Sequence, residues 1–269
     1  MKIPVPFLAS GNRLVVTAEL DRPKGGVIAD AQRVADGGDL YSSILTFLAG
    51  TVSQLEGPEG AIEGQANIRQ ALRSIPYQSS DFLALHALAL TGVDDKIETY
   101  CRCPRCKKQI QDQGVRLQDL EIKFYEPHDG ETEPRPVVRL QYPVEITNRK
   151  TGEILLRVEE VKLRYPCLED CIVSFRAVGM ADQMRLQYRI WLEAIEAVNG
   201  EAVDAKWRNE IGVMIFDRMD IVDLKAISVS LREYGMAQTV KIRCPSCGKE
   251  FEQGVSTADF FAYGLGESE

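Results

Sequence analysis

Two short motifs, each with two cysteines, are the residues of this chain best suited to chemistry. The first is Cys103-Pro104-Arg105-Cys106 and the second is Cys244-Pro245-Ser246-Cys247. A Cys-x-x-Cys turn, called a knuckle below, offers two thiolates to one ion, and zinc favours four such ligands in a tetrahedron. The two knuckles therefore predict a structural zinc site formed by Cys103, Cys106, Cys244 and Cys247. Separate sites, tight turns with free thiols, and a redox pair are the alternatives.

The rest of the sequence favours metal binding by these cysteines over disulfide formation. The first ten residues hold one lysine and an apolar run broken by two prolines, which does not predict a secretory signal. No stretch is apolar enough to predict a membrane span. We therefore expect a cytoplasmic protein, and in that compartment Cys-x-x-Cys pairs are more often metal ligands than disulfides. The seven cysteines are an odd number, and Cys101, Cys167 and Cys171 have no counterpart in the other repeat. Cys167 and Cys171 are expected to be packing thiols, and the alternative is that they complete a site with the first knuckle.

Basic residues around the knuckles are expected to favour the thiolate forms. They are Arg102, Arg105, Lys107, Lys108, Arg243 and Lys249.

No set of residues predicts an enzyme. The two histidines are His86, inside an apolar helical run, and His128, in a polar segment, and neither has a nucleophile or carboxylate pattern beside it. No glycine-rich phosphate loop is present either. The net charge of −8 and the pI near 5.1 argue against binding nucleic acid by neutralising phosphates.

The sequence indicates a tandem duplication, because similar residues recur at a separation of 140 to 143 residues. The first repeat, 1–128, contains the knuckle Cys103/Cys106, and the second repeat, 135–269, contains Cys244/Cys247. Matching pairs extend through both repeats: Leu20 with Leu163, Pro23 with Pro166, Arg33 with Arg176, Gly57 with Gly200, Asp81 with Asp223, Gly92 with Gly235, and Asp119 with Asp259.

Each repeat is predicted to be an α+β unit of a strand, helices and a knuckle-topped hairpin. Strands are expected over 13–20, 142–147, 153–163, 96–102 and 239–243. Apolar spacing of three and four residues predicts helices over 42–55, 66–74, 80–90, 180–198, 205–218 and 221–234. Gly92 and Gly235 are expected at helix C-termini, and the proline-rich segment 126–136 is the predicted linker.

The order of residues around the second knuckle resembles a known family. From Asp223 to Phe261, a helix that begins with Asp is followed by Gly235, a short strand, Cys244-Pro245-Ser246-Cys247-Gly248-Lys249 and an Asp-Phe-Phe ending. This order resembles the baseplate hub and hub-assembly chaperone family of contractile phage tails and related injection systems, and it recurs more loosely from Asp81 to Leu120. Members of that family usually have one knuckle, whereas this chain has two.

The resemblance implies a non-enzymatic protein that forms or helps to build a baseplate hub. It implies hub or tape-measure proteins as partners, a cytoplasmic location during assembly, and a place in the particle if the protein is retained. The sequence does not decide whether the protein forms a homo-oligomer. The apolar residues Phe260, Phe261 and Tyr263 are a candidate surface for contact with another protein. A zinc-ribbon protein that binds nucleic acid and a cysteine-based redox protein are the alternatives.

Overall fold

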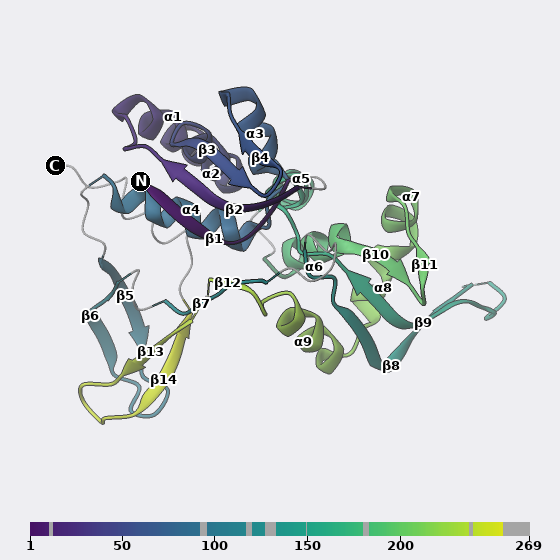
Figure 1. The fold of residues 1–269 in the computed structure, drawn as a ribbon. Coiled ribbons are helices and arrows are strands. Elements are labelled where there is room, and N and C mark those ends of the chain that lie inside the picture. Colours follow the sequence, from purple (N-terminus) through teal and green to yellow (C-terminus); the bar gives the residue numbers. More distant parts are fainter. Residues whose placement is uncertain are drawn as a thin grey trace. The chain divides into compact units, whose positions relative to one another are not determined.

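The chain folds into two compact units in a computed structural model (Figure 1). The first unit comprises residues 1–125 and 234–269, and the second comprises residues 126–233. The structure describes residues 1–10, 13–91, 96–116, 120–126, 133–148, 150–179, 183–236 and 239–254. His128, Gly92, Asp119, Asp259, Phe260, Phe261 and Tyr263 lie outside these ranges.

The first unit begins with a four-stranded antiparallel sheet in the order β1-β2-β3-β4. Its elements are β1 (Lys2–Ser10), β2 (Arg13–Leu20), α1 (Gly25–Asp36), α2 (Leu40–Ala49), β3 (Val52–Gly57), β4 (Gly60–Ile62), α3 (Gln65–Arg73) and α4 (Tyr77–Ala89). Helix α4 is the central helix of this unit, because almost all of its residues, polar ones included, are buried. A helix that is apolar on several faces must be covered on several faces.

Two hairpins complete the first unit. Strand β5 (Lys96–Arg102) pairs with β6 (Gln109–Arg116), and β13 (Thr239–Arg243) pairs with β14 (Glu250–Gly254). The short strand β7 (Ile122–Lys123) pairs with β12 (Gly235–Met236), so two segments more than 100 residues apart run side by side. This pairing returns the chain to the first unit after residue 233.

Gly235 makes close packing against α4 possible. Its φ is +95°, and a Cβ atom there would lie 2.7 Å from Cβ of Gln78. Only glycine accommodates both the backbone conformation and this approach. Gly235 was expected at a helix C-terminus, but helix α9 already ends at Ser230, and Gly235 opens β12 instead.

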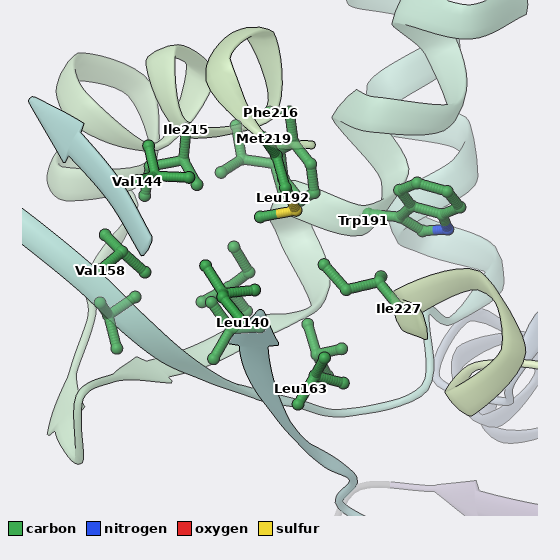
Figure 2. Packing of buried hydrophobic residues seen from close by; sticks show 14 of the residues in the cluster. Leu140, Val144, Val158, Leu163, Trp191, Leu192, Ile215, Phe216, Met219 and Ile227 are labelled. Carbon is green, nitrogen blue, oxygen red and sulfur yellow. The ribbon is translucent and has the colours of Figure 1, made fainter. Parts of the chain in front are cut away.

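The second unit is built around a second four-stranded antiparallel sheet, in the order β11-β10-β9-β8. Its elements are β8 (Val137–Thr147), β9 (Ile154–Leu163), α5 (Leu168–Val178), α6 (Gln183–Ala194), β10 (Ile195–Val198), β11 (Glu201–Ala202), α7 (Ala205–Trp207), the π-helix η2 (Arg208–Gly212), α8 (Val213–Arg218) and α9 (Ile221–Ser230). Figure 2 shows one apolar core, in which Leu140, Val158 and Leu163 of the sheet face Leu192, Phe216 and Ile227 of the helices.

A buried carboxylate joins α9 to the edge of this sheet. Asp223, 2% exposed, accepts hydrogen bonds from the backbone N–H groups of Gln141 (2.7 Å) and Tyr142 (3.1 Å). These two residues lie where the β8–β9 register shifts, between Arg139 and Val144. A strand irregularity leaves backbone donors unpaired, and the carboxylate satisfies them.

The structure corrects several expected boundaries. The helices predicted over 42–55 and 180–198 end at Ala49 and Ala194, and their last residues form the strands β3 and β10. The segment 205–218 is helical but contains a π-helical turn. Strand β1 and helix α1 were not predicted, because prolines and glycines interrupt their patterns.

The compact units do not coincide with the predicted repeats 1–128 and 135–269. Residues 234–254 belong to the second repeat in sequence, but they pack in the first unit because β12 pairs with β7 and the second knuckle meets the first. In the described part of the chain, no helix combines the length and the apolar character needed to cross a bilayer.

Candidate metal centre

The two knuckles are turns of the same conformation. In the first, the Cys103 N–H donates to the Lys108 carbonyl (3.0 Å) and the Lys107 N–H donates to the Cys103 carbonyl (3.0 Å). In the second, the Cys244 N–H donates to the Lys249 carbonyl (2.9 Å), and the Gly248 N–H donates to the Cys244 carbonyl (2.9 Å). Each turn thus directs both of its cysteine side chains to one side.

The conformation requires a left-handed residue after the second cysteine of each knuckle. Gly248 adopts φ +68° there, and Lys107 adopts φ +60° at the matching place. Glycine takes this conformation without strain, whereas a residue with a Cβ atom does so at a cost of about 1 kcal/mol. The first knuckle therefore holds a mildly strained residue in order to form the same turn.

The four thiols converge on one point. Their sulfur atoms all lie within 4.8 Å of one another, and the Cys103–Cys247 and Cys106–Cys244 Sγ–Sγ distances are both 3.7 Å. Sulfurs bound to zinc at about 2.3 Å in a tetrahedron are separated by about 3.8 Å. Each close pair joins one cysteine of each knuckle, so the four residues that the sequence singled out form one group that could hold a metal ion.

Burial and hydrogen bonding make the group unequal in acidity. Cys103 is 0% exposed and Cys244 is 1% exposed. The backbone N–H of Cys106 lowers the pKa of Cys103 to about 6, and the Arg105 N–H and the neighbouring thiols assist against the effect of burial. The Lys249 N–H lowers the pKa of Cys247, but burial and the other thiols outweigh it and raise the pKa to about 11. Four thiolates this close repel one another unless a cation lies between them.

The knuckle amides, more than the basic side chains, therefore account for the acidity of Cys103. Arg102, Arg105, Lys107, Lys108, Arg243 and Lys249 are exposed. In the sequence these cations were expected to favour the thiolates, but the largest contribution comes from the turn itself.

The other three cysteines lie outside the group. Cys101 is buried next to the first knuckle, where burial first, and then Cys103 and Cys244, raise its pKa. Cys171 is buried in α5, as expected for a packing thiol. Cys167 is the N-cap residue of α5, and burial raises its pKa to about 12, so it is a neutral thiol at physiological pH.

His86 is a partly buried histidine with a backbone partner. Its Nδ1 atom lies 2.9 Å from the carbonyl oxygen of Phe82 within α4. Burial lowers its pKa and so favours the neutral form of the ring. In the described ranges, the four knuckle thiols are the group of His, Cys, Asp or Glu side chains with a geometry suited to a metal.

Comparison with known proteins agrees with the sequence resemblance to the extent that both indicate a phage baseplate protein. The family model described as T4 bacteriophage base plate protein matches residues 65–262, a range that contains both knuckles and the whole second unit. No curated protein and no solved structure matches the chain. Because the match covers more than half of the sequence, this chain belongs to the T4 bacteriophage base plate protein family.

Proposed function

We propose that this protein is a non-enzymatic component or assembly chaperone of a phage baseplate hub, and that one structural zinc ion holds its two knuckle hairpins together. The family match over residues 65–262 carries the baseplate assignment. The convergence of four thiols within 4.8 Å supports the metal. Cysteine-only tetrahedral sets are typical of zinc and of iron–sulfur centres, and closed sets of four are typical of structural zinc.

The donor set fits a structural role better than a catalytic one. Catalytic zinc keeps an open position for water or substrate, whereas four protein thiolates fill the tetrahedron. Zinc bound by Cys103, Cys106, Cys244 and Cys247 would supply stability and no reaction. A redox role would instead require the thiols to exchange with a partner disulfide.

Matching element orders support a duplication of the unit. Each half of the chain runs strand–strand–helix–helix–strand–strand, then further helices and a knuckle hairpin, and the two large sheets have corresponding orders. Asp81 in α4 and Asp223 in α9, which match in the sequence, are both buried. The register of β1 shifts between Pro4 and Leu8, as that of β8 does between Arg139 and Val144. We infer that one ancestral unit was copied.

A duplicated unit offers two related surfaces, which suits a protein that holds one hub component while another docks. Hub or tape-measure proteins are the proposed partners. The apolar residues proposed for this contact, Phe260, Phe261 and Tyr263, lie outside the described residues.

Deletion of the gene tests the assembly role. We expect heads, sheath and tube proteins to be made but baseplates to be missing when particles are viewed by electron microscopy. A pull-down with the tagged chain should recover a hub or tape-measure protein directly. Normal infectious tails without the protein would reject the role, and its presence in purified particles would favour a structural component over a departing chaperone.

A further inference from the structure

The knuckle end of the paired hairpins carries a dense set of exposed cations. We call it the knuckle face and define it by Arg102, Arg105, Lys107, Lys108, Lys241, Arg243 and Lys249. All seven side chains are exposed and lie within a few residues of the four thiols. The exposed acidic residues on the same described segments are Glu250 and Glu252.

This local charge is opposite to that of the rest of the protein. The hairpin segments 96–116 and 239–254 contain nine basic and four acidic residues. The remaining sequence contains 23 basic and 36 acidic residues. The basic residues are therefore concentrated where the two hairpins meet, and the excess is not a property of the whole chain.

Six of these seven cations have no polar partner in the part of the fold that the structure describes. Apart from Arg243, none of the seven makes an ion pair or a side-chain hydrogen bond within the part of the chain that the structure describes. The proposed centre of four thiolates and one Zn²⁺ is itself net negative, but the seven cations outnumber this counter-charge, and an external anion relieves the remaining repulsion.

We propose that the knuckle face is a docking surface for an acidic segment of a protein partner. Complementary charge of this kind steers encounter and fixes the register of an interface. The proposal rests on the proposed function only in that the metal holds the two turns in place. It names a surface different from the apolar residues 260–263.

A protein segment fits the surface better than nucleic acid. Duplex DNA carries a charge about every 1.7 Å and extends past a small basic surface, so it would also meet the acidic remainder of the chain. Proteins that bind single strands add exposed aromatic side chains on which bases stack. Phe251, the aromatic residue whose side chain is described on these hairpins, is half-buried. A short acidic segment can contact the knuckle face alone.

The test uses the full, zinc-loaded chain and a fluorescent poly-L-glutamate of about 20 residues, with a duplex DNA of similar charge as the second probe. The charge-reversal variant is Arg105→Glu with Lys107→Glu and Lys108→Glu. The matched control is Arg69→Glu with Lys150→Glu and Lys225→Glu, because these three side chains are exposed elsewhere on the chain.

We expect the wild type to bind poly-L-glutamate with an affinity that falls at least about 10-fold between about 50 and 500 mM salt. The knuckle variant should lose at least about 10-fold in affinity, and the control variant should stay within about 3-fold of the wild type. Equal losses in the two variants, or no binding by the wild type at low salt, would overturn the proposal. Tighter binding to duplex DNA than to poly-L-glutamate would assign the face to nucleic acid instead.

Metal content separates this proposal from the zinc site. Both variants should retain the metal-to-protein ratio of the wild type. If the knuckle variant loses its metal, the charge-neutral variant Arg105→Gln with Lys107→Gln and Lys108→Gln is tested in its place. The docking proposal then requires that this variant binds poly-L-glutamate more weakly than the wild type. If the wild type contains metal but does not bind poly-L-glutamate, the docking proposal is refuted and the zinc site is not. If the protein contains no metal but binds poly-L-glutamate, the zinc site is refuted and the docking proposal is not.

Discussion

Replacing Cys247 by serine should release the second hairpin from the first. A serine hydroxyl is a poor zinc ligand, so the variant retains three of the four thiolates that close the tetrahedron. The change is small in volume and lies at a half-buried position, so packing alone accounts for little of its effect. A loss of stability in this variant should therefore result from the loss of the metal.

The size of this effect follows from the length of the loop that the metal closes. The β7–β12 pair already brings residues 122–123 beside 235–236, so the metal closes a further loop of roughly 25 residues, which costs about 3.5 kcal/mol of chain entropy. Without that pair the loop is roughly 140 residues, and the cost is about 5 kcal/mol. Structural zinc binds with about 10 kcal/mol or more, which exceeds either cost. Losing the metal should thus favour the open form by roughly 300-fold for the shorter loop.

Hydrogen exchange measures this opening at defined amides. The Cys103 and Cys244 N–H groups are bonded within the two knuckles, and we expect their protection to fall at least roughly 100-fold in Cys247→Ser or after chelation. Helix α4 should keep its protection. Elemental analysis should find close to one zinc per wild-type chain and much less in the variant.

Cys167→Ser is the matched control. Cys167 is the N-cap residue of α5 in the other compact unit, and serine is a favoured N-cap residue. This variant should keep its zinc and its stability. The reasoning is refuted if Cys247→Ser keeps wild-type metal content or wild-type knuckle protection, and about two zincs per wild-type chain would indicate separate sites.

Three further perturbations test the fold around the site. Gly235→Ala should destabilise the protein by about 2 kcal/mol or more, because its Cβ would clash with Gln78. Asp170→Ala should cost about 3 kcal/mol, because it leaves the largely buried Arg164 guanidinium without its bidentate partner, now bonded at 2.5 and 2.7 Å. The pKa of His86 is lower in the fold than in the unfolded chain, so its contribution to stability is present above about pH 6.5 and is lost as the pH falls toward the folded pKa.

Denaturant titration measures all three, each against a control. Gly38→Ala shares the positive φ but meets open space, so it should cost only about 1 kcal/mol. Glu159→Ala breaks an exposed ion pair with Arg157 and should cost less than about 1 kcal/mol. His86→Gln should lose less stability than the wild type between about pH 7.5 and 5.5. Equal costs within either pair, or an unchanged pH profile, would contradict the corresponding argument.

The residues of the candidate site were predictable because the chemistry of the knuckles is local. Four thiols at two identical spacings indicate a shared ion without any knowledge of the fold. The approach of the two knuckles was inferred from the repeat, and the structure brings the four thiols together. The origin of the acidity of Cys103 was missed, because it depends on where the Cys106 and Arg105 N–H groups point after the turn forms.

The expected helix boundaries failed where one pattern suits two structures. Val52 and Leu55 are three residues apart, which fits a helix as well as a strand with a register shift. Gly50 was the available signal, since it is the C-cap residue of α2 and, having no Cβ atom, leaves room for Val27, whose nearest atom would lie 2.6 Å from an added Cβ. Ile195 to Val198 contains β-branched residues that favour the observed strand β10. Local pattern cannot show that residues 234–254 join the first unit, because their partners lie more than 100 residues away.

A shared metal site would give the proposed duplication a chemical meaning. One unit of this kind carries a single knuckle, and its two thiols are half of a tetrahedral set. Such a unit can complete a four-thiolate site with a second copy that supplies the other two thiols. In this chain both knuckles are present, and the hairpin that ends the second repeat meets the hairpin of the first. Covalent linkage replaces an association between two molecules by the closure of a loop, whose cost does not depend on protein concentration. The proposed metal centre can therefore form in a single chain before any partner of the baseplate binds.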